Sequence, residues 1–366
     1  MTTGSAGAAN AATMREKERH GRPAASHDAF FETLASYREE VLLELRSLIP
    51  DNGYRAVLYD LMLEYPLREG KGFRPALCLA ACQACGGRMA DAVTSAAALE
   101  LFHNAFLIHD DLEDGSLSRR GSPTLHAKYG VGIAANVGDG MNVLALGTLL
   151  RNVELIGLER ALSTVREAEQ MARESVEGQA IELDWIRFNR ADLTVRDYLT
   201  MCRKKTCWYT CIAPLRIGAL IAGLAGERLR VFNSFGFHVG AAFQIQDDVL
   251  NLTAEERLYG KEIGGDIAEG KRTVMFVHLA GSVRAHDRRR LIRIYGKERL
   301  RKTPADIEFV RSRMDECGSI DFARTLAHRL ALRAGLIFER DLGWIPASPH
   351  RRFLAQMIDY MITRRL

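Results

Sequence analysis

The sequence has few features that would divide a helical chain or fix it in a membrane. Its 366 residues include only 9 prolines, and no Pro-, Gly- or Ser-rich linker interrupts the middle. One large domain over residues 28–366 is therefore expected. No unbroken run reaches the 18 apolar residues of a membrane span, and the N-terminus lacks an apolar signal core. These absences favour a cytoplasmic protein without stable membrane insertion.

Strong net charge and zinc-type cysteine spacing are also missing. The net charge is +4 and the basic residues are scattered, which argues against a nucleic-acid partner. The basic run 284–302 is interpreted as a solvated helix face. The sequence has seven cysteines, an odd number. Closely spaced cysteines such as Cys78, Cys82 and Cys85 are not followed by a second Cys/His pair at the spacing of a zinc site. They are expected to be reduced and mostly buried.

Apolar residues recur at helical spacing through most of the chain, and strand signals are almost absent. The first stripe includes Phe30, Leu34, Tyr37 and Val41 and ends before Pro50. Similar stripes cover about 54–65, 74–85, 91–118, 133–155, 160–188, 195–224, 228–253, 273–295, 304–316, 319–338 and 350–364. Residues 1–27 have no such period and are expected to form a flexible tail. The pattern predicts an all-α fold, a single large helical bundle around a central cavity.

Two short acidic segments interrupt apolar helices far apart in the chain. They are Asp110-Asp111-Leu112-Glu113-Asp114 and Asp247-Asp248-Val249-Leu250-Asn251. The first and fifth positions of each lie about one helical turn apart, so each helix face can offer two oxygen ligands to a hard cation. Carboxylates beside an apolar core are costly without a positive partner. Magnesium bridging to a phosphate group is the partner that fits best.

Basic residues in four other places complete this pattern. They are Gly70-Lys71-Gly72-Phe73-Arg74-Pro75, Arg119-Arg120-Gly121, Lys205-Thr206, and a glycine-rich loop, residues 260–272, that contains Lys261. A helix start favours anions, and guanidinium groups can bind phosphate oxygens in pairs. Taken singly, each could be a helix cap or a solvated charge. Together with the acidic segments they predict a pocket for two phosphate-bearing ligands.

The order of these pieces is similar to a known family. The matching segments are Gly-Lys-Gly-Phe-Arg-Pro (70–75), the stretch 101–114, Arg-Arg-Gly (119–121), Gly-Gln (178–179), Lys-Thr (205–206), Phe-Gln-Ile-Gln-Asp-Asp (243–248), Gly-Lys (260–261) and Gly-Asp-Ile (265–267). From about residue 60 to residue 280 the chain resembles the trans-isoprenyl diphosphate synthases of the polyprenyl synthetase family. Its acidic segments resemble the first and second aspartate-rich motifs of that family.

The resemblance implies a magnesium-dependent prenyltransferase that condenses isopentenyl diphosphate head to tail with an allylic diphosphate, and it implies a homodimer. Three magnesium ions, or manganese in their place, would be held by Asp110, Asp114 and Asp247. The residues assigned to catalysis are Asp110, Asp111, Asp114, Arg119, Lys205, Thr206, Gln244, Asp247, Asp248 and Lys261. The residues assigned to isopentenyl diphosphate are Lys71, Arg74, His103 and Arg120.

Three assignments within the motifs need separate comment. His103 could be a hydrogen-bonded core histidine, but its position two turns before Asp110 favours a ligand-facing role. Asn251 stands where many family members have aspartate, and its carbonyl oxygen could still coordinate a metal or bind a metal-bound water. The floor of the tail cavity is assigned to Phe102, Ala105 and Phe106. This floor predicts geranylgeranyl diphosphate, or alternatively farnesyl diphosphate, as the product.

Two other kinds of function fit an all-α fold with acidic segments. A class I terpene cyclase could share the fold and the magnesium site, but it has no use for a second diphosphate site. A non-catalytic partner subunit of a prenyl synthase would be expected to lose acidic ligands, whereas this chain keeps five aspartates in the two segments.

Overall fold

A computed structural model describes residues 24–68, 70–254 and 263–363 of the chain. The fold is all-α, as predicted, and the strands of the described residues form one two-stranded ribbon. The elements in order are α2 (Ala24–Leu48), η1 (Arg55–Tyr59), α3 (Asp60–Met62), α4 (Glu64–Leu67), α5 (Phe73–Ala84), α6 (Met89–Asp114), β1 (Ser118–Arg119), β2 (Ser122–Pro123), α7 (Leu125–Tyr129), α8 (Val131–Ile156), α9 (Leu158–Arg187), α10 (Val195–Cys202), η2 (Arg203–Ile212), α11 (Ala213–Ile221), α12 (Gly226–Thr253), α14 (Gly265–Glu269), α15 (Val274–Ser282), α16 (Ala285–Tyr295), η3 (Arg299–Arg301), α17 (Pro304–Glu316), α18 (Ser319–Asp341) and α19 (Pro349–Thr363).

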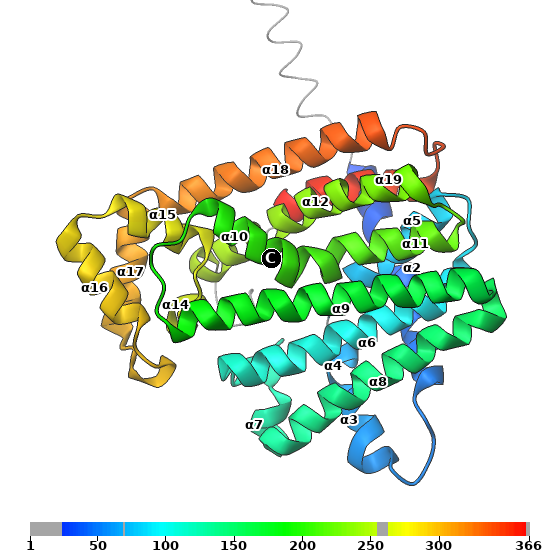
Figure 1. Ribbon diagram of the computed structural model, residues 1–366, viewed down its shortest axis with the longest axis horizontal. Coiled ribbons are helices and arrows are strands. Elements are labelled where there is room, and N and C mark those ends of the chain that lie inside the picture. Colours follow the sequence, from blue (N-terminus) through cyan, green and yellow to red (C-terminus); the bar gives the residue numbers. More distant parts are fainter. Residues whose placement is uncertain (1–23, 69, 255–262, 364–366) are drawn as a thin grey trace, which may run out of the picture.

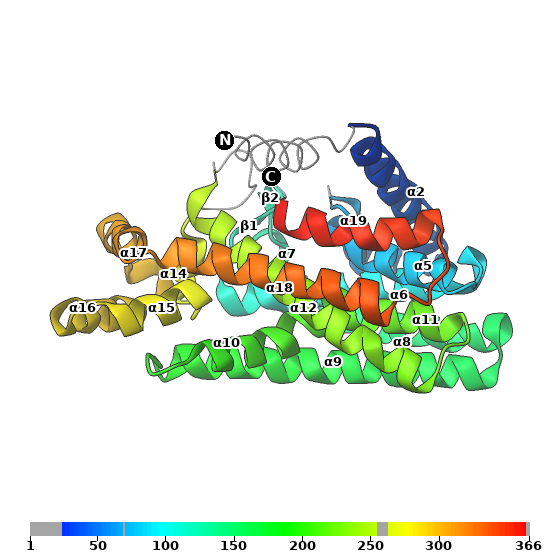
Figure 2. The same ribbon diagram turned by 90° about the horizontal axis from the view of Figure 1, so that it is seen from above.

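The long helices α6, α8, α9 and α12 form the body of the bundle (Figure 1). Seen from above, α15, α16 and α17 lie at one end of the molecule and α2 at the other (Figure 2). Helix α8 packs antiparallel to α6. His109 Nε2 lies 3.3 Å from Asp139 Oδ1 at one end of this contact, and Asn152 Nδ2 donates to Ser95 Oγ at 2.8 Å at the other. These two contacts fix the register between the helices.

One stretch that the periodicity predicts as a single helix contains a π-helix. The stretch 195–224 was expected to be a single helix, but it contains the π-helix η2 between α10 and α11. Here η2 packs closely against both α9 and α12. A Cβ added at Gly178 of α9 would clash with the backbone of Lys205, and one at Gly240 of α12 would lie 3.0 Å from Cys207 Cα. The wider π turns, which are common at functional sites, present Lys205 and Thr206 to the interior.

Other boundaries also differ from those the periodicity predicts. The stretch 54–65 is divided into η1, α3 and the start of α4, and the stretch 273–295 into α15 and α16. Helix α6 ends at Asp114 instead of residue 118, because Gly115 takes a left-handed conformation with φ 62° and caps it. Helix α2 begins at Ala24, within the stretch expected to be tail. All seven cysteines lie in the described residues as free thiols, and five are buried.

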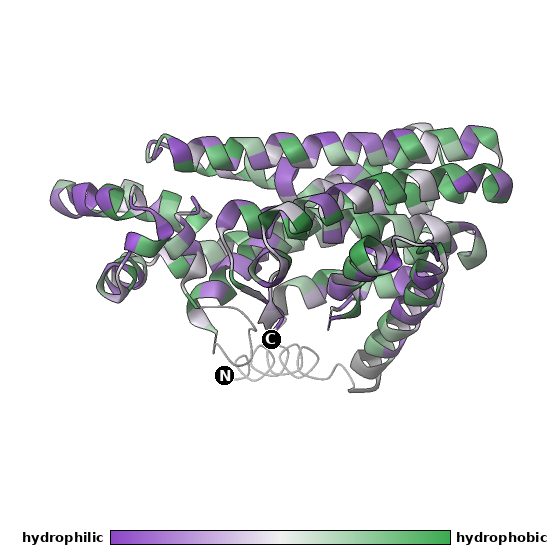
Figure 3. Ribbon diagram, turned by 90° about the horizontal axis from the view of Figure 1, so that it is seen from below, coloured by the Kyte–Doolittle hydropathy of each residue, from purple (hydrophilic) through white to green (hydrophobic). Residues whose placement is uncertain are grey.

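Helix α8 is the most apolar of the long helices in the described residues by the criteria for a membrane span. It has no unbroken apolar run, but its most apolar 18-residue window has a mean hydropathy of 1.3, enough by length and composition to cross a membrane. The core helix of a soluble bundle passes the same test, and α8 packs against α6, α7 and α9. Only 39% of that window is buried. Figure 3 shows hydrophobic residues, in green, recurring along α8 and α9 on this side of the molecule.

Candidate active site

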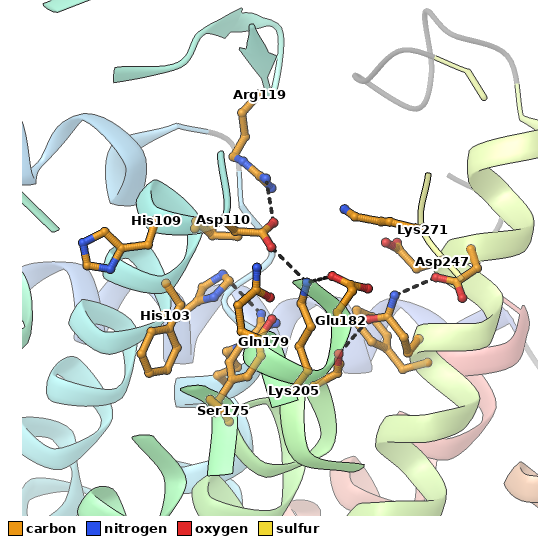
Figure 4. A pocket seen from close by; sticks show the side chains of 18 of the residues that line it. His103, His109, Asp110, Arg119, Ser175, Gln179, Glu182, Lys205, Asp247 and Lys271 are labelled. Atoms are coloured by element: carbon orange, nitrogen blue, oxygen red, sulfur yellow. Dashed lines mark hydrogen bonds and ion pairs between the residues drawn. The ribbon is translucent and has the colours of Figure 1, made fainter. Parts of the chain in front are cut away.

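A cavity of about 1220 Å³ opens between α5, α6, α9, η2 and α12. The first aspartates of the two acidic segments line it. Asp110 on α6 and Asp247 on α12 lie on opposite sides, with Lys205 and Lys271 between them (Figure 4). The structure therefore brings together the two segments that the sequence keeps far apart.

The second aspartate of the first segment points away from the cavity. Asp111 is 1% exposed, and both its oxygens are occupied. Tyr65 Oη donates to Asp111 Oδ2 at 2.6 Å, Arg119 Nη2 donates to Oδ1 at 2.7 Å, and Arg119 Nε lies within 2.9 Å of both oxygens. Such a buried, two-point ion pair fixes the direction of the guanidinium. Asp111 therefore holds Arg119 in place and has no free oxygen for a metal.

The second segment repeats this arrangement. Tyr198 Oη donates to Asp248 Oδ2 at 2.8 Å, and Gln244 Nε2 donates to Oδ1 at 2.7 Å. Thr206 Oγ1 in turn donates to Gln244 Oε1 at 3.1 Å. Burial raises the pKa of Asp248 to about 7, although the bonds from Gln244 and Tyr198 act in the opposite direction. Asp248 thus anchors a chain of hydrogen bonds that orients Gln244 and Thr206 at the cavity wall.

Lys205 is the link between Asp110 and a carboxylate outside the motifs. Its Nζ lies 3.1 Å from Asp110 Oδ1 and also forms an ion pair with Glu182, which is only 5% exposed. Burial disfavours the charge on Asp110, but Lys205, Lys271 and Arg119 outweigh it and hold the pKa of Asp110 well below its usual range. Asp110 is therefore ionised and faces the cavity.

Asp114 lies deeper than Asp110. Its side chain is 3% exposed, and its Oδ2 accepts a hydrogen bond from Lys271 Nζ at 2.7 Å. Burial raises the pKa of Asp114 to about 7, with Lys271 opposing and Asp110 and Glu269 adding to the rise. Lys271 therefore supplies the positive charge that this carboxylate needs.

The carboxylate oxygens of the site suit magnesium only in combination with other ligands. Asp110 and Asp247 offer hard carboxylate oxygens to the cavity, whereas Asp114 is buried against Lys271 and is not among the lining residues. Within the described residues no three His, Cys, Asp or Glu side chains converge closely enough to hold a metal by themselves. Magnesium usually keeps several waters and is bound through one or two carboxylates together with substrate phosphates. These carboxylates therefore suit an ion that is shared with a diphosphate.

A second cluster of residues that line the cavity is cationic. Lys71, Arg74 and Arg120 line the cavity as expected, and Arg38 of α2 joins them. None of the four forms an ion pair with a carboxylate in the part of the chain that the structure describes. Their hydrogen bonds go to neutral groups: Lys71 Nζ to Tyr360 Oη at 2.7 Å, and Arg74 Nη2 to Thr210 Oγ1 at 3.0 Å. The buried carboxylate of Glu100 also lines the cavity and interacts electrostatically with Arg120, Arg74 and Arg38. Four cations beside this one carboxylate leave a net positive charge that favours an anion.

His103 lies beside this cluster and lines the cavity. Burial lowers its pKa well below the ordinary value, and the charges of Arg74, Arg120 and Arg119 add to the effect, so the ring is neutral. Its Nε2 lies 3.3 Å from Arg74 Nη1, whereas its buried Nδ1 has no partner among the described residues. The imidazole can therefore accept from Arg74 and direct Nδ1 to a ligand, a geometry that suits a ligand-facing histidine better than a core one.

Some predicted site residues lie elsewhere. Asn251 is 4% exposed and its Oδ1 accepts from the backbone N–H of Asp266 at 3.2 Å, so it holds the start of α14 instead of facing a metal. Phe106 lines the cavity, but Phe102 and Ala105 do not: they are 3% and 0% exposed inside the helix packing. The assignment of those two to the cavity floor stays a prediction. Lys261 lies outside the described residues.

Several residues that act on this site lie outside the motifs. Glu182 follows the Gly-Gln motif at a spacing that places it on the same helix face as Gln179, which is the one signal that could have found it. Arg38 lies outside every motif. Tyr65 and Tyr198 are buried aromatic residues whose hydroxyl groups become visible only when their aspartate partners are placed.

Comparison with known proteins places this geometry in context. The polyprenyl synthetase family profile matches residues 56–312. A geranylgeranyl diphosphate synthase of Methanosarcina mazei is 33% identical over 295 residues, covering 81% of this chain and 86% of that protein. The crystal structure of a geranylgeranyl pyrophosphate synthetase from Pyrococcus horikoshii superposes with a TM-score of 0.82 at 31% identity, covering 93% of this chain and 99% of the other. A geranylgeranyl pyrophosphate synthase from Corynebacterium glutamicum, crystallised with isoprenyl diphosphate and magnesium, gives a TM-score of 0.79 at 25% identity, with 91% and 99% covered.

Proposed function

Because this chain belongs to the polyprenyl synthetase family and is a trans-prenyltransferase, we propose that it makes geranylgeranyl diphosphate, with isopentenyl diphosphate at the cationic cluster and the allylic diphosphate between the acidic segments. The observation that carries this assignment is that two clusters line one cavity. One cluster has carboxylates for metal ions, and the other has four cations, none of which forms an ion pair with a carboxylate in the described part of the chain.

In the acidic cluster, Arg119 and Lys205 are held by buried carboxylates, so their positive charges are fixed before substrate binds. A diphosphate placed between Asp110 and Asp247 would meet both charges as its C–O bond breaks. Preorganised charge of this kind stabilises the departing anion without rearrangement. Three magnesium ions, or manganese, held at Asp110, Asp114 and Asp247 would add further positive charge to the leaving group. Lys261 is assigned to the same diphosphate.

In the cationic cluster, Lys71, Arg74 and Arg120 would bind the diphosphate of isopentenyl diphosphate, and the Nδ1–H of His103 would donate to it. This binding directs the double bond of isopentenyl diphosphate toward the allylic carbon that ionises. The hydroxyl of Thr206 and the amide of Gln244 lie at the cavity wall, where their dipoles can stabilise the allylic cation. A carbon–carbon bond then forms, and the proton leaves to the released diphosphate.

The apolar face of α8 and α9 supports a homodimer. Aliphatic side chains on this face are exposed to an extent that is unusual for a monomer. They are Val143, Leu146, Leu150, Val153, Leu158 and Leu162. A symmetric dimer would bury the same surface from each subunit. A cytoplasmic location and the single catalytic domain over residues 28–366 belong to the same proposal.

Turnover of the purified chain tests the assignment. The chain is incubated with magnesium, isopentenyl diphosphate and, in separate tubes, the five-, ten- and fifteen-carbon allylic diphosphates, and the products are identified by mass. Mainly twenty-carbon product is expected. Products of thirty carbons or more would contradict the assigned length. Conversion of an allylic diphosphate to a hydrocarbon without isopentenyl diphosphate would identify a cyclase, and no turnover by the isolated chain would indicate a partner subunit.

A further inference from the structure

The ribbon that carries Arg119 and Arg120 is too short to hold its own shape. Strands β1 and β2 have two residues each, and they pair Ser118 with Pro123 and Arg119 with Ser122. A two-stranded ribbon is only marginally stable even when its strands are longer. At its turn Arg120 has a φ of 52°, a left-handed conformation that costs energy for a residue other than glycine. Contacts from outside the ribbon must therefore keep this turn in place.

Arg68, the residue that follows α4, supplies such contacts. Its Nη1 donates to the backbone oxygen of Arg119 at 3.2 Å, and its Nη2 donates to that of Pro123 at 2.8 Å, so one guanidinium bridges both strands. The guanidinium is itself fixed, because it lies 4.4 Å from the centroid of the Tyr65 ring and its Nη2 lies 3.4 Å from Glu64 Oε2. Its side chain is 11% exposed, and Arg68 is not among the residues that line the cavity. Arg68 therefore acts on the ribbon and not on a ligand.

The side chains of the two ribbon arginines are held differently. Arg119 forms the two-point ion pair with Asp111, and Figure 4 shows it extending from the ribbon toward Asp110. Arg120 Nη1, in contrast, donates to the backbone oxygen of Tyr65 at 3.3 Å, and its guanidinium packs on Gly70, where an added Cβ would lie 2.7 Å from Nη1. The direction of Arg120 therefore depends more on the ribbon backbone than the direction of Arg119 does.

We propose that Arg68 is a positioning residue for Arg120, because it fixes the ribbon so that the Arg120 guanidinium faces the cavity. The proposal rests on the proposed function, which assigns Arg120 to the diphosphate of isopentenyl diphosphate. Loss of Arg68 should displace Arg120 and leave Arg119 bound to Asp111. A small displacement of a binding group weakens its contact with the ligand. The effect should therefore fall on isopentenyl diphosphate and spare the allylic diphosphate.

Two substitutions in the full-length protein test this role. Arg68→Met removes both donors and keeps most of the side-chain length, whereas Arg68→Lys keeps the charge without the fork geometry of a guanidinium. Initial rates with magnesium, isopentenyl diphosphate and the fifteen-carbon allylic diphosphate give KM for each substrate. Arg68→Met should raise KM for isopentenyl diphosphate roughly tenfold and leave KM for the allylic diphosphate nearly unchanged, and Arg68→Lys should show a smaller rise. Lys128→Met is the matched control, because Lys128 also pairs with Glu64, at 2.9 Å, but lies on α7, outside the ribbon. It should leave both KM values unchanged.

A double-substitution cycle shows whether Arg68 acts through Arg120. In an Arg120→Ala background, Arg68→Met should add little to the rise in KM for isopentenyl diphosphate. Additive rises in the cycle, an equal rise in both KM values, or an unchanged KM for isopentenyl diphosphate in Arg68→Met would overturn the proposal. If Arg68→Met is unfolded at the assay temperature, Arg68→Lys is compared in the same way. Failure of the proposed function looks different, because the parent chain itself would then form no elongated product from isopentenyl diphosphate.

Discussion

The buried pair of Asp111 and Arg119 allows a test that separates structural from metal-binding aspartates. Asp111→Asn removes the charge from a carboxylate that is 1% exposed and accepts hydrogen bonds from both Tyr65 and Arg119. The guanidinium, 10% exposed in its side chain, would then lose its main counter-charge. Breaking a buried ion pair on one side typically costs about 3–5 kcal/mol. We expect about 3 kcal/mol, near the lower limit of that range, since the amide oxygen still accepts one bond.

For a chain of this size such a loss lowers the midpoint of thermal unfolding by about 4 °C. The assay is thermal and urea unfolding of parent and variant at one protein concentration, together with turnover. Asp110→Asn is the matched variant. This substitution should cost only about 1 kcal/mol of stability, because the Asp110 carboxylate is partly exposed and Lys205 keeps its ion pair with Glu182. Its loss of turnover should be the greater of the two.

The reasoning would be refuted by the reverse order. If Asp111→Asn unfolds like the parent and yet loses as much turnover as Asp110→Asn, then Asp111 acts on the substrate or its metal and the hydrogen bonds to Tyr65 and Arg119 are incidental.

Three further predictions concern other parts of the molecule. Lys71→Ala should lower kcat/KM for isopentenyl diphosphate by roughly ten- to a hundredfold, measured by initial rates; a change below twofold would exclude Lys71 from the second diphosphate site. Leu150→Glu on the exposed face of α8 should convert the protein to monomers in light scattering, and a mass equal to the parent's would disprove that interface. Burial and the neighbouring Arg272 and Arg299 lower the pKa of Lys302 to about 8. Above that pH the unfolded chain binds more protons than the folded one, so parent stability should rise from pH 8 to 10 relative to Lys302→Met in urea unfolding. A constant difference would contradict the lowered pKa.

The helical architecture and the two acidic segments could be predicted from the sequence because both depend on local spacing. A period near 3.6 residues identifies helices, and the one-turn spacing of Asp110 and Asp114 identifies a shared face. The same local rules could not find the π turns of η2, since these depend on close packing against Gly178 and Gly240. These rules also extended the helix at 91–118 too far, because the cap at Gly115 ends the helix while the apolar spacing continues.

The division of labour inside each acidic segment could not be predicted either. Adjacent aspartates on a helix point about 100° apart, but only the packing of neighbours decides which one meets the cavity and which one meets a tyrosine. Asp111 and Asp248 depend on Tyr65 and Tyr198, which are 46 and 50 residues away in sequence. The contact of Lys271 with Asp114 spans 157 residues. Long-range contacts of this kind carry no signal in a single sequence.

The most direct test of the central claim is to locate the metal ions. Crystals of the protein grown with manganese and an unreactive allylic diphosphate analogue would be measured at the manganese absorption edge. The account predicts anomalous peaks that lie about 2.0–2.2 Å from oxygens of Asp110, Asp114 and Asp247, with none bound to Asp111 or Asp248. A peak coordinated by either second aspartate, or no peak between α6 and α12, would contradict it.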